Sequence, residues 1–158
     1  WLSERGEERW FLWVHYFDPH ADYSPPEPFA SRCEGAPYDG EIAYTDAMLG
    51  ELLGGLRASG ELEETLVVVT ADHGEALGDH GEETHGIFIY DSTTHVPLLM
   101  SHPGLPASRR VDEVIGLVDI APTVMDIMGM SYGDGFDGRS YLSAMLSDKD
   151  ISCIQYCY

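Results

Sequence analysis

An aspartate and a histidine stand side by side at the end of an apolar run, and together they could bind a metal ion. The run covers residues 65–71 (TLVVVTA), and Asp72 and His73 follow it directly. A carboxylate and an imidazole can ligate one divalent cation where the backbone turns, and Gly74 permits such a turn. The alternative is an Asx-type turn with an exposed histidine, which is the commoner meaning of the dipeptide alone.

More histidines follow this pair. His80 and His85 come next along the chain, among several glycines, and four of the seven histidines lie between residues 73 and 95. A histidine in its protonated form can stabilise negative charge on a reacting anion. This density favours a functional site, although a histidine-rich segment can also be a solvated acidic loop.

Two more histidines occur in and just after the aromatic run at residues 10–17 (WFLWVHYF). His15 lies inside the run and is expected to be a core histidine with its hydrogen bonds satisfied. His20 follows Pro19 just beyond the run. It is either a simple loop side chain or a cationic, proton-donating partner for an anionic substrate.

Apolar patterning indicates the elements that must position these residues. Runs rich in β-branched and aromatic side chains predict strands, and apolar residues at helical spacing predict helices. Strands are expected over residues 10–17 and 65–71, both buried, and over 95–101, 111–118 and 151–158. Helices are expected over residues 39–56, stopped by Gly60, and over 119–128, followed by Gly129.

This alternation predicts an α/β fold, layered α/β/α with a mostly parallel central sheet. Sites in such sheets form at the carboxyl ends of strands. The stretches HYFDPH and DHGE each fall where a predicted strand ends, so both are expected at one edge of the sheet. The proline-rich loop over residues 18–38 is long for a connection and is expected to shape substrate choice.

Charge and cysteine content limit the class of function. The chain has 28 acidic and 8 basic residues among 158, for a net charge of −20, which argues against nucleic acid and against an anionic membrane surface. No apolar run approaches the roughly 20 residues of a membrane span. An anionic substrate would need a local positive charge such as a metal ion. The three cysteines, Cys33, Cys153 and Cys157, fit neither a disulfide framework nor a metal knuckle. No targeting segment is visible that would indicate a compartment.

Five motifs in order give the chain a resemblance to the sulfatases of the alkaline phosphatase superfamily, over nearly its whole length. The first is HYFDPHADYSPP, which is similar to the family's Asp-Pro-His loop. TADHGEALGDHGEETHG resembles the late metal motif. The others are YDGEIAYTDAMLGELLGGL, HVPLLMSHPG with LVDIAPTVMDIMGM, and DGRSYLSAM. The resemblance implies that residues 1–158 are the C-terminal portion of a catalytic domain, incomplete and without an internal boundary.

The resemblance also implies roles for individual residues. Asp72 and His73 match the late pair of metal ligands, for a divalent ion that could be Ca, Mn or Zn. The Asp-His pair is similar to the phosphonate monoester hydrolase branch, and a nitrogen ligand favours a transition metal over calcium. His85 stands where many relatives have a lysine that grips the substrate's oxyanion, and His20 matches the other substrate-facing residue. His80 is near but matches no firm role.

One departure from the family pattern is large. The family's Cys/Ser-x-Pro-x-Arg motif, which supplies the nucleophile, does not occur in this sequence, and neither do the two early aspartates that complete the metal site. Cys33 is followed by Glu34-Gly35-Ala36-Pro37, which does not fit. We therefore expect half of a metal site and no nucleophile within these residues, and no turnover by the chain alone.

The function expected of the longer enzyme is metal-dependent hydrolysis of sulfate esters, on a small-molecule or saccharide substrate. The alternatives within the superfamily are a phosphonate or phosphate ester hydrolase and a phosphotransferase. An alternative of another class is a noncatalytic metal- or anion-binding module. Self-association through apolar strands is also expected, opposed by the charge.

Overall fold

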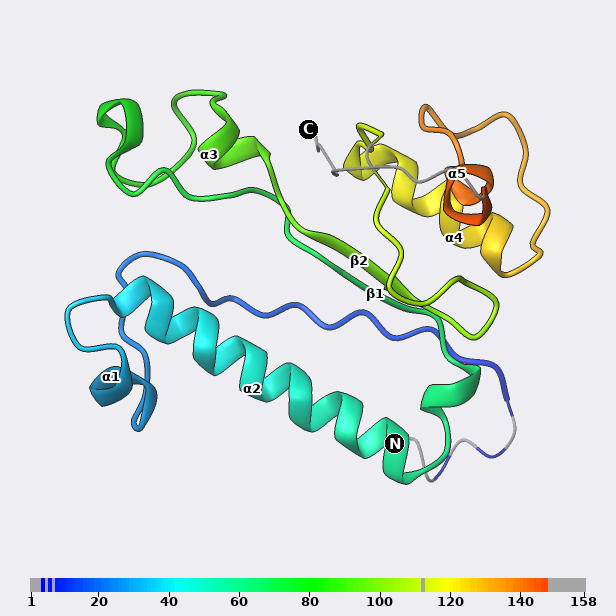
Figure 1. Cartoon of the computed structure of the whole chain (residues 1–158), viewed down its shortest axis with the longest axis horizontal. Coiled ribbons are helices and arrows are strands. Elements are labelled where there is room, and N and C mark those ends of the chain that lie inside the picture. Colours follow the sequence, from blue (N-terminus) through cyan, green and yellow to red (C-terminus); the bar gives the residue numbers. More distant parts are fainter. Residues whose placement is uncertain (1–3, 5, 7, 112, 148–158) are drawn as a thin grey trace. The chain divides into compact units, whose positions relative to one another are not determined.

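The computed structural model describes residues 4, 6, 8–111 and 113–147, and it divides into two compact units (Figure 1). The first is Trp1–Gly55 and the second is Leu56–Tyr158. The division falls inside the helix α2 (Pro37–Ala58). The single domain without an internal boundary stays a prediction.

The aromatic run of the first unit is extended but is not a strand. Residues 10–17 have no regular secondary structure, and the side chains of Phe11 and Trp13 are 80% and 79% exposed. The predicted buried strand is therefore wrong for the structure described. Aromatic composition favours extended backbone, but a strand also requires a hydrogen-bonded neighbour, which composition cannot reveal.

Two helices complete the first unit. The short α1 (Phe29–Arg32) lies within the proline-rich loop. The long α2 confirms the helix predicted over 39–56 and extends it by two residues at each end. Its first residue is Pro37, which suits the first turn of a helix because that position needs no amide donor. Gly60, at φ +80°, donates its N–H to the carbonyl of Arg57 (3.1 Å) and stops the helix as predicted.

The second unit contains a two-stranded antiparallel sheet. The strands are β1 (Val67–Thr70) and β2 (Leu98–Ser101), and β1 follows the short 3₁₀ turn η2 (Leu62–Glu64). Val67 lies opposite Ser101, and Thr70 lies opposite Leu98. Both segments contain the predicted strands, but the burial predicted for the first is wrong, because the side chains of β1 are half-buried up to Thr70, which is exposed. The sheet of the described residues is antiparallel, so the mostly parallel layered arrangement stays a prediction.

The described residues of the segment predicted as a strand over 111–118 form no strand, and the segment ends in a 3₁₀ turn, so that prediction is wrong. Its apolar side chains still form the core, where Val111 and Ile115 pack with Tyr141. Asp119 holds the end of the segment, because its carboxylate accepts the N–H groups of Gly116 and Arg139, both at 2.8 Å. The Gly116 amide, which a strand would have paired with a neighbour, is thus satisfied by a side chain.

The last helices follow this segment. The 3₁₀ turn η4 (Leu117–Asp119) leads into α4 (Ile120–Ile127), which confirms the helix predicted over 119–128, and Gly129 at φ +63° comes just after it. The helix α5 (Leu142–Leu146) packs against α4. The strand predicted over 151–158 lies outside the described residues.

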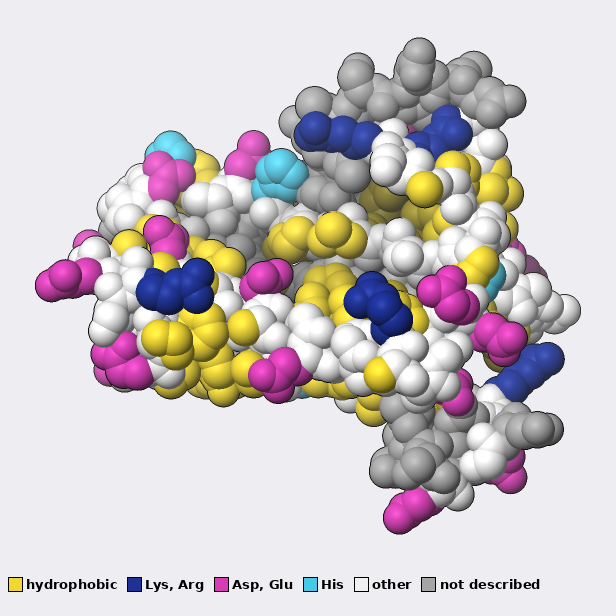
Figure 2. All heavy atoms as spheres, turned by 60° about the horizontal axis from the view of Figure 1, so that its bottom comes forward, with side chains coloured by type: hydrophobic (Ala, Val, Ile, Leu, Met, Phe, Trp, Pro, Cys, Tyr) yellow, Lys and Arg dark blue, Asp and Glu magenta, His cyan; other side chains and the backbone are white. Residues whose placement is uncertain are grey.

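The surface mixes acidic and apolar side chains. On the face drawn in Figure 2, acidic groups are scattered and do not gather in one patch, with apolar side chains exposed between them. Among the residues that the structure describes, no helix is long and apolar enough to cross a membrane.

Candidate metal and substrate site

Just after β1 the backbone passes very close to another segment of the second unit, and Gly74 lies at this approach. The Gly74 N–H donates to the carbonyl of Thr93 in α3 (Asp91–Thr94), at 2.7 Å. A Cβ atom on Gly74 would collide with the backbone carbonyl of Ser92. Only a glycine at this position lets the backbone after β1 lie directly against α3. This contact in turn fixes the position of Asp72 and His73.

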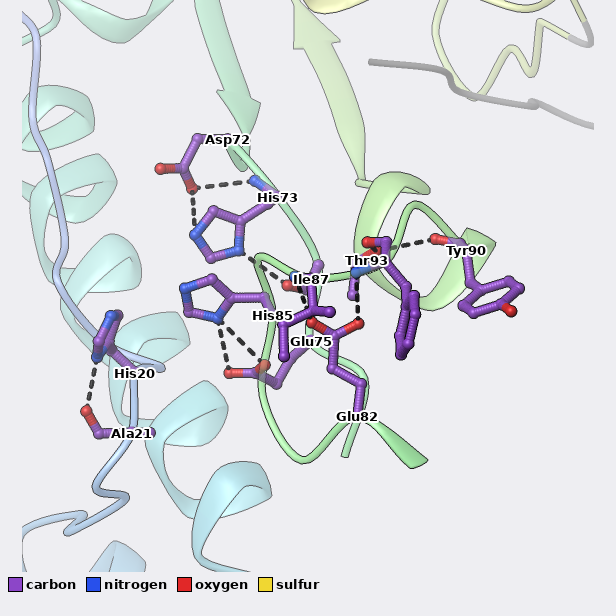
Figure 3. A network of polar contacts seen from close by, with 12 residues as sticks. His20, Ala21, Asp72, His73, Glu75, Glu82, His85, Ile87, Tyr90 and Thr93 are labelled. Atoms are coloured by element: carbon purple, nitrogen blue, oxygen red, sulfur yellow. Dashed lines mark hydrogen bonds and ion pairs between the residues drawn. The ribbon is translucent and has the colours of Figure 1, made fainter. Parts of the chain in front are cut away.

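The loop between Gly74 and α3 folds back on itself. The Ala76 N–H donates to the Thr84 carbonyl at 2.8 Å. The Glu82 carboxylate is buried and accepts the N–H groups of Ile87 (2.7 Å; Figure 3) and Phe88 (3.1 Å). The loop also contains the 3₁₀ turn η3 (Asp79–Gly81). These bonds return the chain, and with it His85, toward the end of β1.

Asp72 and His73 form a pair that is exposed to solvent. The side chain of Asp72 is 81% exposed and that of His73 is 41% exposed. The Nδ1 atom of His73 lies 2.8 Å from the Gly74 carbonyl oxygen, which can only accept, so Nδ1 carries the proton. Its Nε2 atom then presents a lone pair, as metal-binding histidines do when the other nitrogen donates to a carbonyl.

The donor set of this pair suits one divalent cation. The distance from His73 Nε2 to Asp72 Oδ1 is 3.9 Å. Bonds from a transition metal to imidazole nitrogen or carboxylate oxygen are each about 2.0–2.2 Å long, so a single ion can reach both atoms. Over the described ranges, no group of three or more His, Cys, Asp and Glu side chains is arranged to hold a metal ion. Asp72 and His73 could therefore supply two protein ligands to one divalent cation.

His85 lies directly beside this pair. Its ring centroid is 4.0 Å from that of His73, with the ring planes 30° apart. Its Nδ1 atom is 3.2 and 3.4 Å from the two carboxylate oxygens of Glu75, whose side chain is only 5% exposed. Figure 3 shows both imidazoles turned the same way, each with its hydrogen-bonded Nδ1 toward the loop. The structure therefore brings together three of the four residues singled out from the sequence.

His80 is held in another part of the loop. Its ring stacks on Tyr90 with centroids 3.7 Å apart, and its Nε2 lies 3.7 Å from the Asp79 carboxylate. The side chain of His80 is half exposed, and these contacts are with Tyr90 and Asp79, not with Asp72 or His73.

His20 belongs to the first unit, where a buried glutamate holds its backbone. Glu41 is 3% exposed, and its two oxygens accept the N–H groups of His20 (3.0 Å) and Ser24 (2.6 Å). The His20 ring lies 4.5 Å from that of Phe17, and its Nδ1 contacts the Ala21 carbonyl at 2.7 Å. Within the unit, the Asp-Pro-His loop is thus fastened to α2. Its predicted place at the same sheet edge as Asp72 stays a prediction.

Three glutamates with clear structural partners were missed by the sequence reasoning: Glu41, Glu75 and Glu82. Each has a carboxylate enclosed by the protein, whereas acidic residues in an acidic chain are expected at the surface. One signal was present, because DHGE occurs twice, at residues 72–75 and 79–82. It does not reveal that one glutamate faces an imidazole while the other accepts backbone amides.

Comparison with known proteins adds to this geometry. The family model described as Sulfatase matches residues 1–130. Arylsulfatase K of Bos taurus is 42% identical over 105 residues, which are 66% of this chain and 19% of that protein. The chain therefore spans about a fifth of the length of this curated relative.

Two solved structures are similar in fold. Phosphonate monoester hydrolase SpPMH from Silicibacter pomeroyi gives a TM-score of 0.64 at 33% identity, covering 70% of this chain and 22% of that one. BT4656, solved in complex with its substrate D-glucosamine-2-N,6-O-disulfate, gives a TM-score of 0.65 at 27% identity, covering 76% of this chain and 24% of that one.

Proposed function

This chain belongs to the sulfatase family, and we propose that it supplies part of the active site of an enzyme that hydrolyses sulfate esters. We further propose that residues 1–158 form the C-terminal part of one alkaline phosphatase-like catalytic domain, layered α/β/α around a mostly parallel sheet. The observation that carries the proposal is the assembly of Asp72, His73 and His85 just beyond β1.

Asp72 and His73 are the residues that hold a divalent cation. Asp72 contributes a carboxylate oxygen, and His73 contributes Nε2, because its Nδ1 proton is engaged by the Gly74 carbonyl. When bound, such an ion supplies positive charge that polarises the ester and activates the nucleophile. Calcium, manganese and zinc are the ions proposed, and the imidazole ligand favours the last two.

His85 and His20 face the substrate in this proposal. In its protonated form, His85 donates from Nε2 to oxygen that gains negative charge as the ester bond breaks, since its Nδ1 is directed at Glu75. His20 does the same for the leaving oxygen or the transferred group. The nucleophile is not among these residues and comes from elsewhere in the enzyme. Because the acidic chain would repel an anionic substrate, these local positive charges also serve binding.

The substrate proposed is a sulfate ester of a small molecule or a saccharide. The similarity to BT4656, whose solved complex holds a disulfated glucosamine, supports a saccharide. The similarity to a phosphonate monoester hydrolase supports a second candidate, cleavage of phosphonate or phosphate esters at the same site. The noncatalytic binding module is the outcome left if neither activity is found.

The test compares substrates on the full natural polypeptide that carries this chain. Aryl sulfate, aryl phosphate and aryl phosphonate esters are offered to the enzyme before and after metal removal by a chelator. We expect the highest kcat/KM with the sulfate and restoration of activity on return of the metal. A preference for the phosphonate would select the second candidate, and no turnover of any ester would leave the binding module.

A further inference from the structure

Glu75 is a buried carboxylate directed at the imidazole of His85. We propose that Glu75 is a positioning residue: it accepts the Nδ1 proton of His85, fixes the ring's orientation and tautomer, and so makes Nε2 the atom offered to the substrate. This inference rests on the proposed function of His85. It adds a residue to the site for which the sequence motif suggested no role.

The contact itself supports this role. Both Glu75 oxygens lie within 3.4 Å of Nδ1, and the side chain is 5% exposed, compared with 25% for His85. A carboxylate enclosed to this degree is costly unless a partner satisfies it. An ionised carboxylate only accepts hydrogen bonds, so the ring nitrogen facing it must be the donor. One tautomer is thereby selected whenever the imidazole is neutral.

The ring is restrained from a second direction. The face of His85 lies against that of His73, at 4.0 Å between centroids. Glu75 therefore holds one edge of the imidazole while His73 covers one face. A ring fixed in this way presents its Nε2 without first losing rotational freedom, which is the benefit that a positioned catalytic group gains.

The backbone brings the two partners together independently of their side chains. Ala76 and Thr84, the neighbours of Glu75 and His85, are joined by a hydrogen bond of 2.8 Å from N–H to carbonyl. Ala76 is also buried. Removal of the Glu75 carboxylate should therefore leave this backbone contact in place and release the ring.

The loop provides matched controls. Glu83 has the same chemical type and charge, lies two positions from His85 along the chain and is exposed. Glu82 is buried, but its carboxylate accepts backbone amides. Glu83→Gln thus reproduces the change in charge without the contact. Glu82→Gln alters the support of the loop without touching the Nδ1 contact.

The first experiment measures the tautomer. Histidine side chains in the full natural polypeptide are labelled with nitrogen-15, and the His85 signals are assigned by their loss in His85→Ala. We expect a single Nδ1-protonated form at a pH where the ring is neutral, retained in Glu83→Gln. In Glu75→Ala we expect a shift toward the Nε2-protonated form. An unchanged His85 spectrum in Glu75→Ala would overturn the inference.

The second experiment measures turnover. Since partners that orient an active-site ligand typically contribute 10–100-fold, we expect Glu75→Ala to lower kcat by about that factor with a smaller change in KM. On a His85→Ala background the same substitution should add no further loss, because Glu75 acts through that ring. Glu83→Gln should stay within about twofold of the parent.

The outcomes separate the two claims. If His85→Ala retains full activity, the proposed function of His85 fails. If His85→Ala is impaired but Glu75→Ala is not, only the positioning role fails. A further loss on the His85→Ala background would assign Glu75 to the stability of the loop and would also overturn the inference.

Discussion

The imidazole rings of His73 and His85 lie face against face, with centroids 4.0 Å apart and planes tilted by 30°. One ring belongs to the turn after β1, and the other to the loop that returns from η3. In the proposed site the first ring holds the cation and the second faces the substrate. In this proposal, the residue that binds the metal and the residue that contacts the substrate are therefore packed against each other.

Metal affinity should depend on one of the two Asp-His pairs and not on the other. Asp72→Ala removes a proposed ligand, and we expect the affinity of the full natural polypeptide for Mn²⁺ or Zn²⁺ to fall at least about tenfold. Asp79→Ala is the matched control, since Asp79 also lies beside a histidine, at 3.7 Å, in the second DHGE. Calorimetry measures both. Equal losses would show that the cation is gathered by charge alone.

Gly74→Ala should destabilise the protein through a backbone collision. The added methyl group meets the Ser92 carbonyl, and overpacking of this kind costs about 1–3 kcal/mol. Gly54→Ala is the control, because Gly54 lies in α2 with open space around it. There alanine should stabilise by roughly 0.5–1 kcal/mol. Denaturant unfolding of both variants checks the signs, and a neutral Gly74→Ala would disprove the close approach.

Glu41→Gln should loosen the Asp-Pro-His loop of the first unit. A glutamine has one accepting oxygen, so one of the two amides of His20 and Ser24 loses its acceptor, at a cost of about 1–3 kcal/mol. We expect faster hydrogen exchange at these amides. Glu51→Gln, at an exposed position of α2, should leave both rates unchanged. Equal exchange in the two variants would refute the anchoring role.

The sequence predicts the elements that carry their own local signals. The helix over 39–56 has helical spacing and Gly60 beyond its end, and the structure confirms both. The run at 65–71 is β-branched except at Leu66 and Ala71, and it contains β1. The segments at 10–17 and 111–118 were also predicted as strands, but their described residues form none, because pairing depends on distant partners. Val111 and Ile115 are buried all the same, so composition predicted their burial better than their backbone.

In the site, too, local motifs were visible in the sequence and contacts between distant residues were not. Asp72, His73 and His85 could be singled out because their chemistry is visible in a motif and because strand ends are where α/β sites form, and their roles stay predictions. Glu75 and Glu41 were missed, since each acquires its role only when the chain returns a nitrogen donor to its carboxylate. Loop closure through Ala76 and Thr84 creates the first of these contacts. The spacing rules for helices and strands do not predict a loop closure of this kind.

Sulfate ester turnover by the full natural polypeptide, in Asp72→Ala and Asp79→Ala side by side, tests the central claim most directly. The two variants remove the same group from the same tetrapeptide motif at two places. We expect Asp72→Ala to lower kcat/KM for an aryl sulfate about 100-fold, because it removes a metal ligand from the reacting centre. Asp79→Ala should stay within about twofold of the parent. Full activity in Asp72→Ala, or equal losses in both variants, would contradict a sulfatase site built on Asp72, His73 and His85.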